Sequence, residues 1–587
     1  MIRTVDPRTH RRSFEDDAPG QRRAPPDRGG GLGAWTIFLG GVAIAAVDQL
    51  WNPWFNDVPW SPAVPGAFAL IALTRKRWRS ALLELGAAAA LALTTAMPSD
   101  PAPVKVLVVG IDGATFDVID PEGAALPNFL ALREEGARTT LRSMEPMFSP
   151  LLWTTIASGR LPGEHGIRGF RVHSQDCKVA RFWDVAEDAG QRIGLWKWLV
   201  DYPPRVVAGF WVPSWLAPGP ETWPPTLTAV KELELSQRTH RKRVATERSL
   251  PELTWALVRQ GLRLSTLAEA AAWTVEQRAA AFLLRPTEAA RADVRQQVLR
   301  GAIDRDLFVA QLHRERPDLA TFTYYGVDAI GHLYWDRHAA GSDELRAAYR
   351  AADDILGSLR AELGPDARLV VVSDHGFQAM DNAGGANGPE GRFLPKTERL
   401  RARLSHHFDD ARVDVTRVGQ KLTVSMDRTL IHAASTWLLE LRDTGGNPVF
   451  RVEQDDANTL ALTLAADQYD SARIARDRVG SEPMRDYIAL DTRYTGTHES
   501  RGILYVAGPG VTAGGTLSAA SILDVAPTVL AAAGLAASDE MPGRNVVPGW
   551  GDLPRVRSWD GLVGKLRWIK AEDGVQEEQL KVLGYTE

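Results

Sequence analysis

The 587-residue chain contains a single cysteine, Cys177. One thiol excludes an intramolecular disulfide framework and any cysteine-rich zinc site, but it leaves the compartment open, because extracytoplasmic proteins can lack disulfides. The chain also lacks a strong charge of either sign, since 68 Lys and Arg residues stand against 73 Asp and Glu residues. A nucleic-acid-binding surface usually needs a basic domain, so no nucleic-acid partner is indicated.

The overall composition is that of an ordinary globular protein. Hydrophobic residues make up 44% of the chain and charged residues 24%, which excludes a fully disordered, collagen-like or mainly membrane-embedded protein. No internal repeat is evident. The length predicts more than one domain and is ample for a large buried core.

The first hundred residues differ from this average. Residues 1–31 are rich in Arg, Asp, Pro and Gly and predict a disordered arm. Three uncharged or nearly uncharged blocks follow and predict a membrane region over residues 32–98 with two to three helices, at Gly29–Val47, Val58–Leu73 and Ser80–Met97. Buried apolar helices or a signal peptide are the alternatives, although the late start of the first block disfavours a cleavable signal.

Basic residues predict the orientation of these blocks. The arm carries seven arginines, and the link Arg75–Arg79 is also basic, so both are expected on the cytoplasmic side. The first two blocks would then form a hairpin, and the third would cross outward. This predicts a protein of the cytoplasmic (inner) membrane, anchored in the lipid bilayer, whose residues after about Pro98 are extracytoplasmic. This topology requires the second block to span the bilayer.

From Pro103 onward, apolar strands alternate with helical patterns. This alternation predicts an α/β fold with a mostly parallel central sheet. The expected strands are residues 104–112, 318–328, 367–376 and 502–511, followed by a closing helix at 521–535. We expect a catalytic domain over residues 103–550 with insertions at about 214–305 and 379–495, and a C-terminal helical tail at 551–587.

Acidic and His residues follow several of these strands. In open α/β sheets the carboxyl ends of the strands form the edge where ligands bind. The candidates are Asp112 in GIDG, Asp328 and His332 in GVDAIGHLYW, Asp374 and His375 in VVVSDHG, and His498 in TGTHES, in a loop ahead of a strand. The i, i+4 spacing of Asp328 and His332 places both on one face of a helical turn. Each motif alone is weak, because such matches are often fortuitous.

Ser149, in MFSPLLWTTIASG, has a strong helix-start signal because Pro150 follows it. A helix cap is the plain interpretation. However, a hydroxyl at a helix N-terminus also lies where backbone N–H groups and the helix dipole favour an anion. Ser149 is therefore a candidate nucleophile.

The order and identity of these motifs resemble the alkaline phosphatase superfamily, in its type I phosphodiesterase/nucleotide pyrophosphatase branch. The resemblance spans roughly residues 104–550 and rests on the segments VGIDG, SPLLWTTIASGRLPGEHGI, YYGVDAIGHLYW, VVVSDHGF, GTHESRGILYVAGPGV and ILDVAPTVLAAAGL. It implies an alkaline-phosphatase-like three-layer α/β/α fold, beyond the predicted N-terminal transmembrane helices.

The resemblance also implies a chemistry. Asp328, His332 and His498 would hold one divalent metal ion, and Asp112, Asp374 and His375 a second, with Ser149 bridging towards the second. The ligands suit zinc, with manganese or iron as substitutes. Ser149 would attack the phosphorus of a phosphate-ester substrate and form a phosphoseryl intermediate.

The chain departs from this family at one position. Many members carry an Asn three residues after the nucleophile, where this chain has Leu152. Arg160 and Lys197 are weak candidates for the missing phosphate contact, and Arg168 and His165 weaker ones. His165 lies in a turn that it is expected to fix.

Three other functions are alternatives to a phosphate-ester hydrolase. A sulfatase is disfavoured because no C/S-x-P-x-R pattern is present. A phosphoethanolamine- or phosphoglycerol-type transferase also joins membrane helices to this fold and remains the main alternative to a membrane-anchored hydrolase. A non-catalytic membrane scaffold is disfavoured because all six presumed ligands are present.

Overall fold

The structure is a computed structural model that describes residues 101–570, except for 103, 171, 237–247, 283–288, 336–341, 380–391, 419–420, 455–456, 466–477, 480–481, 492–494 and 552. The predicted arm, the predicted membrane region and residues 571–587 of the predicted tail lie outside these residues. Among the helices that are described, none has the length and apolar character needed to cross a bilayer. The membrane blocks therefore stay a prediction from the sequence.

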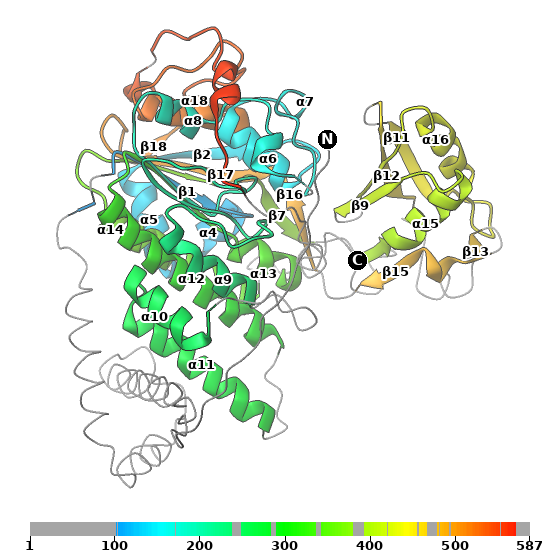
Figure 1. Cartoon of the computed structure of the whole chain (residues 1–587), viewed down its shortest axis with the longest axis horizontal. Helices are drawn as coiled ribbons and strands as arrows, with labels where there is room; N and C mark the ends of the chain where they lie inside the picture. The colour runs from blue at the N-terminus through cyan, green and yellow to red at the C-terminus, as the bar shows by residue number, and fades with distance from the viewer. Residues whose placement is uncertain are drawn as a thin grey trace, which may run out of the picture. The chain divides into compact units, whose positions relative to one another are not determined.

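A large central sheet organises the main body (Figure 1). β1, β5, β6, β3 and β4 run parallel, whereas β17 is antiparallel to both of its neighbours, β6 and β2. The order across the sheet is β18 (Gly515–Thr516), β2 (Ala137–Arg142), β17 (Arg501–Ala507), β6 (Arg368–Val372), β1 (Val106–Ile111), β5 (Leu319–Tyr324), β3 (Ile193–Trp196) and β4 (Gly209–Val212), with β19 (Ala520–Ser521) also paired to β2. The predicted mostly parallel α/β sheet is confirmed.

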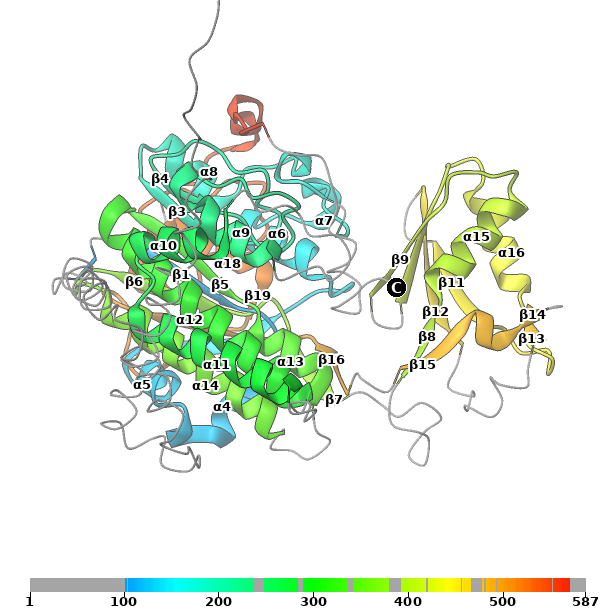
Figure 2. The ribbon, with the colours of Figure 1, turned by 60° about the horizontal axis from the view of Figure 1, so that its bottom comes forward.

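Alternate residues of the central strands enter two different cores, because successive side chains of a strand point to opposite faces. Val106 and Val108 join a core with α6 (Ser149–Ser158), α8 (Phe182–Asp188) and α18 (Val525–Ala532). Leu107 and Val109 join a core with α5 (Pro127–Glu135), α12 (Ala289–Glu315) and α14 (Asp343–Ala361). Helices thus cover both faces of the sheet, as Figure 2 also shows.

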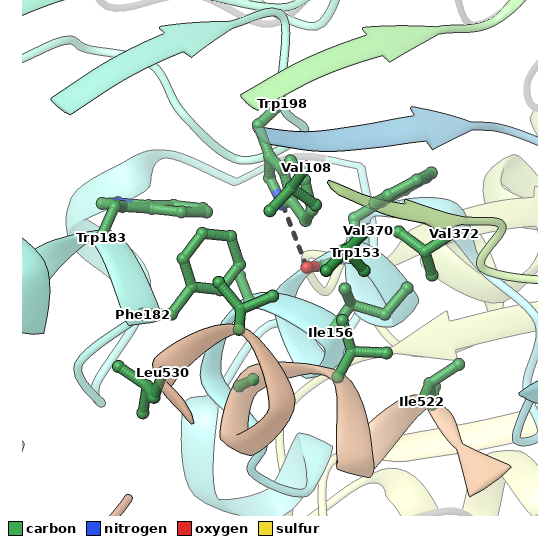
Figure 3. Close-up of a cluster of buried hydrophobic side chains, with 14 of the residues drawn as sticks. Val108, Trp153, Ile156, Phe182, Trp183, Trp198, Val370, Val372, Ile522 and Leu530 are labelled. Carbon is green, nitrogen blue, oxygen red and sulfur yellow. Dashed lines mark hydrogen bonds between the residues drawn. The ribbon is translucent and has the colours of Figure 1, made fainter. Parts of the chain in front are cut away.

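Tryptophan and phenylalanine rings fill the first of these cores (Figure 3). Trp153, Trp183 and Trp198 are fully buried with Phe182, and their rings meet edge to face, with centroids of Trp153 and Trp198 4.9 Å apart. The indole N–H of Trp198 donates a hydrogen bond to the Trp153 carbonyl at 3.1 Å. This packing fixes α6 against the sheet and so fixes where the helix begins.

The first predicted insertion, at about 214–305, is helical where it is described. It contains α9 (Thr228–Ser236), α10 (Leu250–Gln260), α11 (Leu264–Phe282) and the first half of α12. Apolar residues of α9 and α10 enter the same core as α12, among them Val230, Leu253 and Leu257. The insertion therefore packs onto the sheet domain rather than forming a core of its own.

The second predicted insertion, at about 379–495, has its own core. Its antiparallel sheet has the order β11 (Phe450–Gln454), β12 (Thr459–Leu464), β10 (Lys421–Ser425) and β9 (Asp414–Val418). Leu460 and Leu462 of β12 are buried with residues of α15 (Thr397–His407) and α16 (Ile431–Glu440). The chain enters this insertion after β7 (Gly376–Ala379) and leaves it at β16 (Gly496–Glu499), and these two strands pair with each other.

The described part of the predicted C-terminal tail contains a 3-10 helix at Asp560–Lys565. Beyond it, Ile569 donates its backbone N–H to the Pro204 carbonyl at 3.0 Å. The Trp568 ring packs against the guanidinium groups of Arg181 and Arg205. Residues 566–570 are therefore held against the main body.

Candidate functional site

Six acidic and imidazole side chains converge at the carboxyl edge of the sheet. The adjacent parallel strands β6, β1 and β5 end at this edge, and each is followed by candidate residues from the sequence. Asp112 follows β1, and Asp374 and His375 follow β6; Asp328 and His332 lie on α13 (Gly326–Tyr334), which follows β5, and His498 lies on β16. All six are buried. The structure therefore brings together every predicted ligand except Ser149, whose position is described separately below.

Asp328 is the centre of the first half of this cluster. Its Oδ1 atom lies 3.3 Å from His498 Nε2, 3.5 Å from His332 Nε2 and 3.9 Å from His375 Nε2. The His332 and His498 Nε2 atoms are 3.1 Å apart. Asp328, His375 and His498 offer ligand atoms close enough to hold one ion.

His375 also belongs to the second half of the cluster. Its Nε2 atom lies 3.4 Å from Asp112 Oδ1 and 3.6 Å from Asp374 Oδ2, and these three residues form a second group that could hold an ion. His375 thus lies between the two groups, and the structure does not separate the two predicted ligand sets cleanly.

Backbone carbonyls orient two of the imidazoles. His498 Nδ1 lies 3.0 Å from the Met147 carbonyl, and His375 Nδ1 lies 3.0 Å from the Gly376 carbonyl. A carbonyl can only accept, so Nδ1 carries the proton in each ring and Nε2 keeps its lone pair. Metal-binding histidines are usually held in this way.

The carboxylates of this cluster repel one another. Burial, followed by the charges of Asp374 and Asp328, raises the pKa of Asp112 well above its usual range. Burial and then Asp328 raise the pKa of Asp374 to about 7. Burial acts in the same direction on Asp328, but the neighbouring imidazoles of His332, His498 and His375 lower its pKa to about 2. A cation bound between these groups would relieve the repulsion among the carboxylates.

Ser149 lies in a cavity that Asp112 and Asp328 also line. Its side chain is 2% exposed, and its hydroxyl oxygen has no hydrogen-bond partner among the described residues. We predicted Ser149 as the N-cap, but α6 begins at Ser149 and Phe148 is the capping residue. The reason is that Phe148 has an extended backbone and its carbonyl already accepts the first helical hydrogen bond, from the Leu152 N–H.

One further sequence prediction is corrected here. His498 lies in the short strand β16, opposite Phe377 of β7, rather than in a loop, because the two ends of the second insertion pair as antiparallel strands. Leu152, which stands where many family members have Asn, is fully buried in the core under α6. A phosphate contact would therefore have to come from another residue.

The weaker candidates divide between the site and the scaffold. Lys197 lines the cavity, with its ammonium 2.8 Å from Asp304 Oδ2. Arg160 does not belong to the described cavity wall, and its guanidinium binds Glu164, Glu540 and Asp560. His165 accepts a hydrogen bond from the Ile167 N–H and contacts the Thr155 hydroxyl at 3.0 Å, which fits the turn-fixing role expected for it.

Two residues of the site were missed by sequence reasoning. The indole N–H of Trp153 donates to Asp112 Oδ2 at 3.1 Å, and this Trp lies on α6, one turn after Ser149. Its ring needs the absence of a side chain at Gly110, where a Cβ atom would lie 2.6 Å from Trp153. Ser373 accepts a hydrogen bond from the Ala114 N–H at 3.0 Å and donates to the His375 carbonyl. Only the position of Ser373 before Asp374 could have suggested its role.

Residues 106–388 match the family described as type I phosphodiesterase / nucleotide pyrophosphatase. This part of the chain belongs to that family. The match begins at β1 and includes every candidate residue of the cluster except His498. The type I phosphodiesterase family is metal-dependent. Membership of this family identifies the chain as a phosphoric ester hydrolase. No curated protein sequence was found to match the chain.

Proposed function

We propose that the chain hydrolyses phosphate esters, as a phosphodiesterase or nucleotide pyrophosphatase, through a phosphoseryl intermediate on Ser149. The observation that carries this proposal is the buried Ser149 hydroxyl, which has no partner among the described residues and shares a cavity with Asp112 and Asp328. An unpaired buried hydroxyl costs about 1–3 kcal/mol, so its retention favours a functional role.

The residues fit two divalent metal ions. Asp112 Oδ1, Asp328 Oδ1, both Asp374 oxygens and His375 Nε2 are buried with no hydrogen-bond partner among the described residues, as ligand atoms are in a metal-free structure. The proposed sets are Asp328, His332 and His498 for one ion, and Asp112, Asp374 and His375 for the other, with Ser149 beside it. Carboxylate and imidazole donors suit zinc, manganese or iron. When bound, such a pair stabilises charge on the attacking and leaving oxygens.

The residues of the chain would act as follows. The backbone N–H groups of the first turn of α6 bind the phosphate oxygens, because a helix N-terminus favours anions. Ser149 gives its proton to water and its oxygen bonds to phosphorus, while the bond from phosphorus to the alcohol oxygen breaks. The alcohol oxygen keeps the electron pair and takes a proton from water. A water molecule then attacks phosphorus and gives up a proton to the solvent. The bond from phosphorus to the Ser149 oxygen breaks, and this oxygen takes a proton from water.

The proposal is tested on the zinc-loaded protein with bis-p-nitrophenyl phosphate. We expect release of p-nitrophenol that stops on chelation, and a loss of about 10³-fold or more in Ser149→Ala. Ser158→Ala, at the other end of α6, is the matched control and should keep most of its activity. Acid quenching should trap the p-nitrophenyl phosphate ester of Ser149 in the parent protein only.

Two outcomes would contradict this assignment. Full activity in Ser149→Ala would exclude Ser149 as the nucleophile. Slow turnover with water that accelerates when an acceptor alcohol is added would instead indicate a transferase of the same superfamily.

Attachment to the cytoplasmic membrane, with the hydrolase outside the cytoplasm, is a separate proposal. It rests on the apolar blocks and arginines of residues 1–98. Protease treatment of cells with a permeabilised outer envelope and an intact inner membrane should digest the catalytic domain. Digestion only after the inner membrane is lysed would contradict this orientation.

A further inference from the structure

A cavity of about 100 Å³ extends from the metal cluster into the first insertion. Ser149, Asp112 and Asp328 form one end of its wall. The other end is formed by side chains of α9, α12 and the residue after β3, among them Glu234, Arg300, Asp304 and Lys197. A phosphate held at Ser149 would therefore direct one of its ester groups towards these charged side chains.

Lys197 is held rigidly in the wall of this cavity. Its backbone has a φ of 59°, in the left-handed region that is unfavourable for a residue with a side chain. The Lys197 N–H donates to the Val212 carbonyl at 2.7 Å, and the Tyr325 hydroxyl donates to the Lys197 carbonyl at 2.5 Å. Its ammonium lies 2.8 Å from Asp304 Oδ2 and 3.3 Å from Glu234 Oε2. Such a strained conformation persists only where its surroundings determine it, and it is often found at functional sites.

The inner wall carries charges of both signs. Two cations, Lys197 and Arg300, face two anions, Glu234 and Asp304. Lys231 lies behind the wall and binds Glu234 at 3.0 Å and the Ser214 carbonyl at 2.6 Å. An anionic ligand would meet the carboxylates, and a cationic ligand would meet Lys197 and Arg300. The wall therefore suits a neutral ligand that can both donate and accept hydrogen bonds.

The Tyr324 hydroxyl is an independent sign of a ligand. Tyr324 lines the cavity and is 4% exposed, and its hydroxyl has no hydrogen-bond partner among the described residues. A Cβ atom at Gly326 would lie 2.1 Å from this oxygen, so the glycine leaves the hydroxyl its space. A buried hydroxyl of this kind gains a partner when water or a ligand with its own polar group enters the cavity.

We propose that this cavity is the leaving-group site for a small, neutral, polyhydroxylated alcohol such as a three-carbon polyol. Hydroxyl groups donate to carboxylates and accept from ammonium, guanidinium and phenol groups, so they match every polar group of the wall. The volume equals on the order of three water molecules. It is below the ~300–1,000 Å³ of sites for drug-sized ligands, which favours a small leaving group.

The inference rests on the proposed function, because the polyol is the alcohol released when its bond to phosphorus breaks. We would compare glycerol 3-phosphate, propyl phosphate and adenosine 5′-monophosphate, and the methyl diester of each, on the zinc-loaded full chain. We expect kcat/KM for the glycerol esters to exceed that for the propyl and adenosine esters by about tenfold or more, the factor for one or two hydrogen bonds. Equal rates for glycerol and propyl esters, or a preference for adenosine, would overturn the proposal.

Tyr324→Phe tests the proposed hydrogen bond to the polyol directly, because it removes only the hydroxyl. It should lower the ratio of glycerol-ester to propyl-ester kcat/KM by about five- to tenfold, through one lost hydrogen bond. Tyr505→Phe alters another buried tyrosine, which packs against Phe116 and Phe129 outside the described cavity wall, and should leave the ratio unchanged. A merely structural role for Tyr324 would change stability but not this ratio, and an unchanged ratio overturns the proposal.

The two proposals fail in different ways. If bis-p-nitrophenyl phosphate is not hydrolysed, the proposed function fails and the polyol site fails with it. If that compound is hydrolysed with loss of activity in Ser149→Ala, but the alcohol series shows no preference for glycerol, only the polyol site is wrong.

Discussion

Two buried clusters of charged side chains lie beside the same edge of the sheet, and they differ in how their charges are balanced. In the first, three carboxylates and three imidazoles meet with no Lys or Arg ion pair to any of the carboxylates among the described residues. In the second, Lys197 binds both Asp304 and Glu234, and Lys231 binds Glu234. Among the described residues, the carboxylates of the first cluster have only imidazoles as ion-pair partners, whereas those of the second pair with ammonium groups.

The pKa values reflect this difference. Burial and like charges raise the pKa of Asp112 and Asp374. Burial opposes the charge of Lys197, but Asp304 and Glu234 raise its pKa above the usual value. A buried charge is tolerated only when it is paired or coordinates a metal. This difference supports the proposal that the first cluster binds metal ions and that the second shapes the pocket beside it.

The largest effect is expected for Asp374→Asn. We expect phosphodiesterase activity to fall by about 10⁴-fold, because removing this ligand withdraws the metal-derived charge stabilisation of several kcal/mol. In the chelated protein the same change should raise the melting temperature, because one of the mutually repelling carboxylates is gone. Hydrolysis of bis-p-nitrophenyl phosphate measures the loss of activity. Scanning calorimetry with and without zinc measures the change in melting temperature.

The control for this prediction is Asp120→Asn, an exposed carboxylate bound by Arg138. It should leave activity and the zinc-dependent stabilisation unchanged. If Asp374→Asn lowers the melting temperature of the chelated protein, the inferred repulsion among the carboxylates of the first cluster is wrong.

The second prediction concerns the paired cluster and has the opposite sign. Lys197→Met should lower the free energy of unfolding by about 3–5 kcal/mol, because it leaves Asp304 and Glu234 buried without this partner. Urea unfolding in chelator provides the measurement. Lys105→Met removes another ammonium, 2.8 Å from Asp318 but 72% exposed, and should cost less than about 1 kcal/mol. Equal losses of unfolding free energy in the two variants would show that the buried ion pairs of Lys197 matter no more than an exposed one.

The smallest expected effect is that of Trp153→Phe. The change removes the N–H that binds Asp112 Oδ2, and loss of such a supporting hydrogen bond typically weakens metal binding by about 10–100-fold. Zinc affinity is measured by competition with a chromogenic chelator. Trp183→Phe shortens another ring of the same core and should leave zinc affinity within about twofold if the hydrogen bond, rather than packing, is responsible.

Much of the fold followed from local patterns. The continuous apolar runs that became β1, β5, β6 and β17 predicted buried strands, because a strand covered on both faces needs apolar residues at every position. The Asp328 and His332 spacing predicted one helical face, and α13 provides it. The start of α6 was misplaced by one residue because the decisive feature is the backbone of Phe148, which the Ser-Pro pattern does not specify.

The sequence by itself determined which residues are candidates for the proposed chemistry and that strands of one sheet would present them at one edge. Parallel strands end on the same side, so their following residues converge whatever the rest of the chain does. Only the tertiary structure decided that His375 lies between both ligand groups and that Trp153 holds Asp112. It also decided that Lys197 lines a cavity with Glu234 and Asp304. These contacts join segments as far apart as Asp112 and His375, which are 263 residues apart in the sequence, and long-range packing rather than local periodicity sets such distances.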